Sequence, residues 1–230
     1  MNQFNILAGK KWCACGDSFT HGDFTGLEES EKYIEEGRYK GQYKVYPYLI
    51  GNRNDMDIVM NAYNGASIAE CGRKYDQTFV RGHYKDIPLD SNYITLYFGI
   101  NDWHQHVPVG NIDDKDPETF YGAWNIVMEY LLTNYPFAHI GIIITNGINT
   151  GNDHSYTDAE RNIARRWGIP YLDMEQGNVP LVHRVDRDGV CQYAKDIRMK
   201  NFIVSAENKH PNPKAHAYES TFIENFLRSL

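Results

Sequence analysis

The sequence predicts an open α/β fold in which a parallel sheet of about five strands lies between two layers of helices. Two observations predict it: short apolar runs recur along the 230 residues, and segments with helical periodicity stand between or after them. The runs are continuous rather than alternating, which is typical of strands that are covered on both faces in a parallel sheet. The alternation of strands and helices then implies right-handed crossovers between strands.

Each apolar run is short enough for a strand and ends where polar or glycine residues begin. The five predicted strands are residues 11–15, 56–62, 93–98, 139–145 and 170–174. Asp116 and Pro117 indicate a helix start, and apolar residues at helical spacing follow until Tyr135 and Pro136. Further helices are predicted over residues 157–167, where Gly168 would form a left-handed cap, and over residues 213–230.

The organisation of the chain indicates a single domain over residues 1–230. No internal repeat, low-complexity tract or linker divides it, and a chain of this length can bury a sizeable core. We expect residues 175–206 to form a long connection that borders the active site, because loops of such length are usually functional.

The charge balance argues against nucleic acid and anionic membranes as partners. The 23 basic residues against 30 acidic ones give a net charge of −7, and the basic residues form no cluster. The sequence contains no membrane-spanning run and no signal peptide. We therefore expect a cytoplasmic protein, or one exported through a signal that has been removed, which acts on a neutral small molecule or carbohydrate.

The four cysteines are too few for a disulfide scaffold in a chain of this length, so we expect buried, reduced thiols. Cys13 and Cys15 lie two residues apart in a predicted strand and share one face. No second Cys or His pair completes four ligands, and we therefore expect no metal site.

Polar turns follow the first three predicted strands, at the sheet edge where ligands bind in open α/β folds. The turns are residues 16–20, 64–67 and 99–102, and a fourth polar segment, 207–213, precedes the last helix. Together they supply the groups that acyl transfer requires. Ser18 offers a nucleophilic hydroxyl, His210 a base, and Glu207, three residues earlier, a carboxylate that can orient the imidazole. The oxyanion donors would be the backbone N–H groups of Ser18 and Gly65 and the side-chain amide of Asn101.

These four segments resemble the ordered blocks of the SGNH (GDSL-type) hydrolase family, and the resemblance spans most of the chain. The matching residues are Gly16-Asp17-Ser18, Gly65, Gly99-Ile100-Asn101-Asp102 and His210-Pro211-Asn212. The resemblance implies a flavodoxin-like three-layer fold and ester hydrolysis through an acyl-serine, without a metal or an organic cofactor. By position, Ser18 is similar to the family's nucleophile, Gly65 and Asn101 to its oxyanion donors, and His210 to its base.

The acidic residue departs from the family pattern. The family usually has Asp three residues before the histidine, where this chain has Glu207. Either Glu207 orients His210, as a glutamate does in some α/β-hydrolases, or a backbone carbonyl takes that role.

Several neighbouring residues have both a structural and a functional interpretation. Asp17 and Asp102 are interpreted first as turn-stabilising residues, with Asp17 also a candidate for substrate contact. Trp103 and His104 are candidates to line the pocket. His21 and Asp23 lie just beyond the nucleophile and are interpreted as loop residues, with a contact to the leaving group as the alternative. A cluster of tyrosines has two interpretations: exposed rings can bind the faces of sugars, but tyrosines more commonly lie half-buried with the hydroxyl in contact with water. Four of them cluster before the expected end of the first helix: Tyr39, Tyr43, Tyr46 and Tyr48.

The sequence favours a serine esterase that acts on small acyl groups, with acetylated sugars as the expected substrates. Segment 175–206 is mixed and charged, unlike the amphipathic lid of an enzyme that acts on lipid surfaces. Two alternatives remain open. One is a thioesterase or lysophospholipase with the same catalytic groups. The other is a catalytically impaired carbohydrate-binding protein on the same fold.

Overall fold

Five parallel strands form one sheet at the centre of the molecule. The computed structural model describes residues 5–72, 78–145, 154–176, 179 and 189–230. The strand order is β2-β1-β3-β4-β5, so the chain lays β2 on one side of β1 and the remaining strands on the other. The strands are β1 (Lys11–Gly16), β2 (Asp57–Ala62), β3 (Tyr93–Tyr97), β4 (His139–Ile144) and β5 (Tyr171–Asp173). All five agree with the strands predicted from the apolar runs to within two residues at each end.

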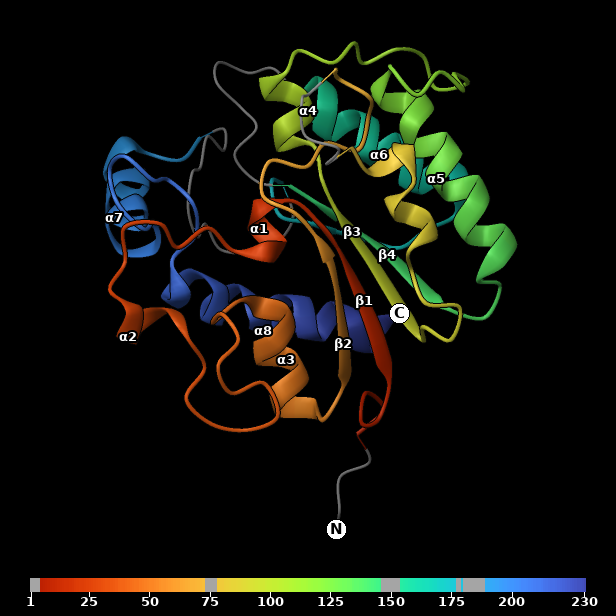
Figure 1. The fold of residues 1–230 in the computed structure, drawn as a ribbon. Coiled ribbons are helices and arrows are strands. Elements are labelled where there is room, and N and C mark those ends of the chain that lie inside the picture. The colour runs from red at the N-terminus through yellow and green to blue at the C-terminus, as the bar shows by residue number, and fades with distance from the viewer. Residues whose placement is uncertain (1–4, 73–77, 146–153, 177–178, 180–188) are drawn as a thin grey trace.

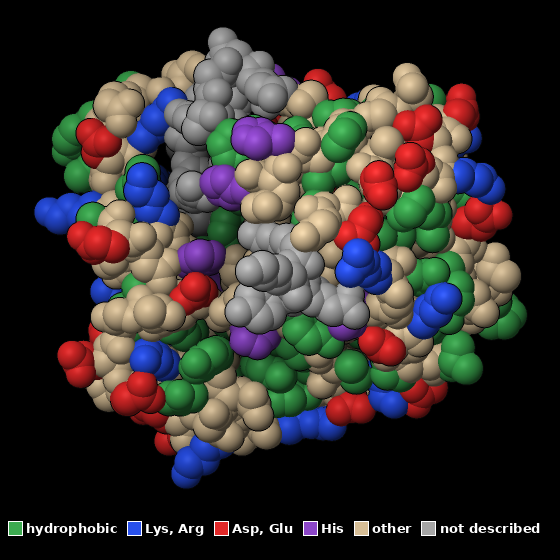
Figure 2. Space-filling view, turned by 45° about the horizontal axis from the view of Figure 1, so that its top comes forward, with side chains coloured by type: hydrophobic (Ala, Val, Ile, Leu, Met, Phe, Trp, Pro, Cys, Tyr) green, Lys and Arg blue, Asp and Glu red, His purple; other side chains and the backbone are tan. Residues whose placement is uncertain are grey.

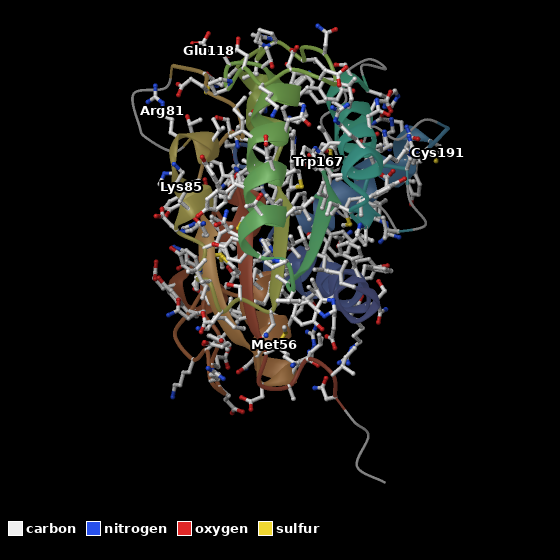
Figure 3. All side chains as sticks on the ribbon, turned by 90° about the vertical axis from the view of Figure 1, so that its right-hand side faces the viewer. Met56, Arg81, Lys85, Glu118, Trp167 and Cys191 are labelled. Carbon is white, nitrogen blue, oxygen red and sulfur yellow. The ribbon has the colours of Figure 1, made fainter. Side chains whose placement is uncertain are left out.

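Helices cover both faces of this sheet, which confirms the predicted three-layer, flavodoxin-like architecture (Figure 1). α3 (Tyr46–Asn54) and α8 (Pro213–Ser229) pack together on one face, and α5 (Phe120–Asn134) and α6 (Ser155–Trp167) on the other. The Trp167 side chain, labelled in Figure 3, donates a hydrogen bond from Nε1 to Asn125 Oδ1 of α5 at 2.9 Å. The shorter helices are α1 (Ser18–His21), α2 (Glu29–Lys32), α4 (Ile100–His104) and the 3₁₀ turns Phe79–Arg81 and His83–Lys85.

The core lies between the sheet and its helices because the central strands are apolar on both sides. Every residue of β3 is buried, and the side chains of β1 are buried from Trp12 onwards. Trp12 Nε1 donates to Thr95 Oγ1 of β3 at 3.0 Å, which satisfies two polar groups inside the core. None of the helices in the described ranges has the length and apolar character that a membrane span requires.

Helix ends follow local capping chemistry, with one correction. Gly168 ends α6 in the left-handed conformation, and Asn212 caps α8 by accepting from Ala215 N, so both predicted boundaries are confirmed. α5 begins at Phe120 with Thr119 as its cap, rather than at Asp116 and Pro117. Asp116 instead accepts from Glu118 N at 2.9 Å and makes a separate turn before the helix.

The predicted connection over residues 175–206 contains a helix, α7 (Gln192–Phe202), that the sequence did not indicate. α7 has no buried residue, so it lacks the apolar stripe by which a helix is recognised in a sequence. Residues 177–178 and 180–188 of this connection lie outside the described residues.

The expectation of buried, reduced cysteines is met only in part. All four are free: Cys13 and Cys15 are buried in β1, whereas Cys71 is half-buried and Cys191 is exposed. Figure 3 shows Cys191 at the periphery, before α7. The prediction of burial was therefore wrong for Cys191, which lies just outside a helix that is itself exposed.

Candidate active site

The candidate active site lies where the order of the strands reverses. The chain leaves β1 for its neighbour β2 on one side and leaves β3 for β4 on the other, so the turns after β1 and β3 diverge and open a crevice between them. Ser18 follows β1, and Asn101 follows β3. The fold therefore brings the first and third polar turns together at the carboxyl edge of the sheet.

Ser18 begins α1 immediately after β1. Asp17 caps this helix by accepting a hydrogen bond from Phe19 N at 2.8 Å. Gly16 is needed at the preceding position because a Cβ there would lie 2.9 Å from the carbonyl oxygen of Tyr97 and closer still to Thr20. The tight packing at Gly16 therefore constrains the backbone from which the Ser18 side chain extends.

His210 meets Ser18 although the two residues are 192 positions apart: His210 Nε2 lies 2.9 Å from Ser18 Oγ. The turn that carries His210 is fastened at both ends. Ile203 pairs with Pro211, and Asn212 Nδ2 donates to the carbonyl oxygens of Asn201 and Ile203 at the end of α7. The Phe19 ring stands edge-on to the imidazole at 6.0 Å between centroids and restricts its rotation.

Asn208 determines which nitrogen of His210 carries the proton. Asn208 Nδ2 faces the carbonyl oxygens of Thr25 at 2.9 Å and of Asp23 at 3.3 Å, so the amide end that points the other way is the oxygen. That oxygen lies 2.6 Å from His210 Nδ1. Because an amide oxygen only accepts, Nδ1 carries hydrogen and Nε2 presents a lone pair to Ser18 Oγ.

Asp23 supplies the negative charge beside this pair. Its Oδ2 lies 3.8 Å from His210 Nδ1, and its Oδ1 accepts from Asn208 Nδ2 at 3.3 Å. Partial burial opposes ionisation, but hydrogen bonds from Thr25 and the proximity of His210 hold the pKa of Asp23 below its ordinary value. The carboxylate is therefore ionised near neutral pH, where it stabilises a positive charge on His210.

Glu207 does not occupy the position that the sequence predicted for it. Its carboxylate accepts from Ser205 Oγ at 3.0 Å, while Asn208 and Asp23 face the Nδ1 side of His210. The prediction assumed that residues three apart share one face of the turn, but residues 205–210 form an irregular turn in which the Glu207 carboxylate bonds Ser205 instead. The sequence held no signal for Asp23, because its contact with Asn208 spans 185 positions.

The predicted oxyanion donors lie around the same crevice. Asn101 Nδ2 donates to the carbonyl oxygen of Ala66 at 2.9 Å and lies 3.4 Å from Asp17 Oδ2, so it joins the β3 turn to the turn that holds Gly65. Asp102 accepts from the backbone N–H groups of Ile68 and Ala69, at 3.1 and 2.9 Å. Asp102 is therefore a turn-stabilising residue, as predicted, and it anchors the Gly65 segment. The donation by Ser18, Gly65 and Asn101 to an oxyanion stays a prediction.

A cavity of about 260 Å³ opens over Ser18. Figure 2, which turns the carboxyl edge towards the viewer, shows histidine side chains around a hollow in this surface. Beside Ser18 and His210, the residues that line the cavity are Phe19, Ile100, Asn101, His104, Glu207, Asn208 and Lys209.

Two further candidates do not line the cavity. Trp103 packs against the hydrophobic core and contacts the His104 ring at 4.6 Å between centroids. Asp17 is 1% exposed, and its carboxyl caps α1 beneath Ser18, so its turn-stabilising role is the one seen here, while its contact with substrate stays a prediction. Within the described ranges, no group of three or more His, Cys, Asp or Glu side chains is arranged to hold a metal ion.

Comparisons with known proteins find similarity in solved structures alone. No family model and no curated protein matches the chain. A protein from Lactobacillus plantarum is similar over 97% of this chain and 98% of its own, with 23% identity and a TM-score of 0.70. A candidate GDSL-like lipase from Bacteroides ovatus is similar over 97% of this chain and 100% of its own, with 18% identity and a TM-score of 0.63.

A third similar structure is a carbohydrate esterase family 2 enzyme with a carbohydrate-binding domain, from Corynascus thermopiles (Myceliophthora fergusii). The similarity covers 99% of this chain and 68% of that one, with 14% identity and a TM-score of 0.58. At such identities a likeness establishes the fold and not the activity. The five-stranded parallel sheet and these neighbours together show that the chain has the fold of the SGNH, or GDSL-type, hydrolases.

Proposed function

We propose that this protein is a serine esterase that removes small acyl groups, acetyl above all, from carbohydrate esters. The observation that carries the proposal is the contact of Ser18 Oγ with His210 Nε2 at 2.9 Å, on the wall of a cavity. A serine hydroxyl becomes nucleophilic when a base of this kind accepts its proton. A helix cap, the ordinary role of a serine at a strand-to-helix turn, is filled here by Asp17.

The proposed reaction proceeds in two steps. Ser18 Oγ attacks the ester carbonyl carbon while His210 Nε2 takes the hydroxyl proton, and the imidazolium then protonates the alcohol oxygen as its bond to the acyl carbon breaks. Water attacks the acyl-serine, gives its proton to the same nitrogen, and releases the carboxylic acid as Ser18 regains its hydrogen. The N–H groups of Ser18 and Gly65 and the amide of Asn101 would stabilise the oxyanion in both steps.

In this mechanism Asn208 and Asp23 replace the acid that the family pattern leads one to expect at position 207. Asn208 Oδ1 holds the tautomer that leaves Nε2 free to accept a proton. The Asp23 carboxylate, 3.8 Å from Nδ1, stabilises the imidazolium that forms when Ser18 loses its proton. An amide paired with histidine also occurs in papain-like proteases, which use Cys-His-Asn.

The preference for short acyl groups rests on the size and chemistry of the cavity. A volume of about 260 Å³ lies below the range of roughly 300–1,000 Å³ that is typical of drug-sized ligands, and many of its lining residues are polar. A long acyl chain would require an apolar channel. The similarity to a carbohydrate esterase supports the choice of a sugar as the alcohol.

The test compares p-nitrophenyl esters of increasing acyl length with acetylated xylan and acyl-CoA. We expect kcat/KM to be highest for acetyl and to fall as the acyl chain lengthens. Rising activity towards long chains would indicate a lipase, and a preference for acyl-CoA a thioesterase. A fluorophosphonate probe should label Ser18, and a carbohydrate-binding protein without activity would leave it unlabelled.

Substitutions test the proposed roles. Ser18→Ala and His210→Ala should lower kcat by about 10⁴-fold or more. Asp23→Asn and Asn208→Ala should each lower kcat, by less than the roughly 10⁴-fold of an orienting carboxylate in direct contact with the imidazole, because the imidazole loses its charge partner or its orientation. Glu207→Gln makes the matching carboxylate-to-amide change in the turn that carries His210. It should lower kcat less than Asp23→Asn does. The reverse order would return the acid's role to Glu207.

A further inference from the structure

A second cavity, of about 270 Å³, lies beside the candidate active site, and three of its lining residues are tyrosines. α1 connects the two cavities: Ser18 lines the first, and His21, one helical turn further on, lines the second. Three residues of α-helix span only about 4.5 Å along the axis. The main lining residues are His21, Tyr33, Gln42, Tyr43, Tyr48 and Met60.

The aromatic walls of this second cavity are held in place from behind. Tyr43 packs against Phe24, with 5.3 Å between ring centroids, and against Tyr33 at 5.2 Å. Tyr48 packs against Tyr39 at 5.0 Å. The Tyr39 hydroxyl is itself fastened, since it donates to Met56 O and accepts from Ile58 N, both at 2.7 Å. Rings that are already positioned lose little entropy when a ligand binds to them.

The chemistry of the lining selects a neutral, polyhydroxylated ligand. In the part of the chain that the structure describes, the lining includes no Asp, Glu, Lys or Arg, and the charged neighbours of Tyr33, Glu29 and Lys32, pair with each other at 2.7 Å. The tyrosine rings present flat apolar faces, while their hydroxyls, the Gln42 amide and the His21 imidazole supply hydrogen bonds. A sugar ring combines apolar C–H faces with hydroxyl groups around its edge.

We propose that this cavity, which we call the tyrosine subsite (Tyr33, Tyr43 and Tyr48), binds a neutral sugar residue of an oligosaccharide whose esterified residue lies at Ser18. The inference rests on the proposed function and narrows its substrate from small acetyl esters to acetylated oligosaccharides. Of the four tyrosines that cluster in the sequence, only Tyr43 and Tyr48 line the subsite. Tyr46 is buried with its hydroxyl bonded to Thr20, and Tyr39 supports Tyr48 from behind.

Binding is measured on the Ser18→Ala protein, so that no substrate is consumed. Neutral xylo-, gluco- and manno-oligosaccharides are titrated up to about 10 mM by calorimetry and ligand-observed NMR. We expect at least one series to bind, and Tyr48→Ala to weaken its binding by about fivefold or more, whereas Tyr48→Phe retains the ring and most of the affinity. The matched control is Phe137→Ala, which removes an aromatic ring that is 95% exposed, in the connection between α5 and β4.

Catalysis provides an independent measurement in the active protein. The ratio of kcat/KM for an acetylated oligosaccharide to that for p-nitrophenyl acetate should fall about fivefold or more in Tyr48→Ala, through a higher KM for the oligosaccharide. In Phe137→Ala the ratio should stay at the wild-type value. Circular dichroism and thermal unfolding of each variant establish that a loss reflects the missing ring and not a misfolded chain.

The outcomes separate this inference from the proposed function. Oligosaccharide binding that depends on Tyr48, together with ester hydrolysis, supports both. If the oligosaccharide binds through Tyr48 but no ester is hydrolysed, the esterase proposal fails and the tyrosine subsite stands. If hydrolysis occurs while no oligosaccharide binds, or while Tyr48→Ala leaves binding and the kcat/KM ratio unchanged, the subsite is overturned.

Discussion

The Asp17 carboxyl caps α1, but the burial of this carboxyl opposes its ionisation. As the cap of α1 it accepts from Phe19 N, which places Ser18 at the start of the helix. Burial, with a further contribution from the nearby Asp102 carboxylate, nevertheless raises the pKa of Asp17 to about 8. Asp102 is also buried but accepts two backbone N–H groups. The carboxyl of Asp17 is therefore protonated in the folded protein near neutral pH, while that of the unfolded chain is ionised.

Asp17→Asn should change how stability depends on pH. Between the ordinary pKa of 3.8 and the folded value of about 8, the unfolded chain has released a proton that the folded chain retains. The free energy of unfolding therefore falls as pH rises through this window, by up to about 1.4 kcal/mol per pH unit. Asn has no proton to release and still offers an oxygen to Phe19 N, so the variant should lack this slope.

Urea unfolding at pH 5, 6, 7 and 8 measures the effect. The control is Asp113→Asn, which makes the same change at a side chain that is 78% exposed. Parallel curves for the wild type and Asp17→Asn would show that the Asp17 carboxyl is ionised in the folded state.

At the scale of elements, α8 determines where the base lies. The turn with His210 leads directly into this helix, and Asn212 both caps α8 and binds the end of α7. α8 in turn lies close against β4, because Gly141 has no side chain: a Cβ there would meet the Phe226 ring at 2.8 Å. A glycine in the middle of a strand, which weakens the strand in isolation, is thus required by the approach of the helix.

Gly141→Ala should destabilise the protein by about 1–3 kcal/mol, because the added methyl group overlaps the Phe226 ring and moves α8 away from the sheet. The measurement is chemical unfolding, combined with kcat of the variant, since His210 would move with α8. Phe226→Leu removes the overlapping ring, so the double variant should be less destabilised than the two single effects predict. Strict additivity would mean that the ring does not limit the approach.

Across the whole molecule, one buried ionic network ties a helical layer to the sheet. Arg161 of α6 is 7% exposed and contacts Asp173 of β5 at 2.8 Å and Glu175 at 2.7 Å. Burial opposes the charge on Asp173, but the hydrogen bonds and charge of Arg161 hold its pKa below the ordinary value. The network also includes Thr157, whose hydroxyl donates to Glu175 at 2.8 Å. It thereby fastens the edge strand β5, which has three residues and one strand neighbour.

Arg161→Met should destabilise the protein by about 3–5 kcal/mol near neutral pH, since it removes the cation that the Asp173 and Glu175 carboxylates share. The added changes Asp173→Asn and Glu175→Gln should restore part of this loss. In the wild type, the contribution of Asp173 is present above its ordinary pKa of 3.8 and is lost as pH falls through the lower folded value. The gap between wild type and Arg161→Met should therefore narrow in acid. An unchanged gap from pH 7 to pH 3 would contradict the assignment.

The sequence by itself determined the architecture, because a strand that is covered on both faces must be apolar throughout. The five strands, α6 and α8 follow from such local patterns. The polar turns after the strands indicated Ser18 and Asn101, and the polar segment before the last helix indicated His210. α7 was missed because none of its residues is buried, and the start of α5 was misplaced because Asp116 and Thr119 are both good caps.

Only the tertiary structure decided which group faces His210. Asp23 and Asn208 are brought together by the packing of the segment after α1 against the turn before α8, a contact between residues 185 positions apart. Sequence spacing predicts neighbours only within a regular element, and the turn around Glu207 is not one. The tyrosine subsite has the same origin. Its rings all come from residues 33–48, but whether a tyrosine of this stretch supports the wall or forms it depends on which neighbour covers it.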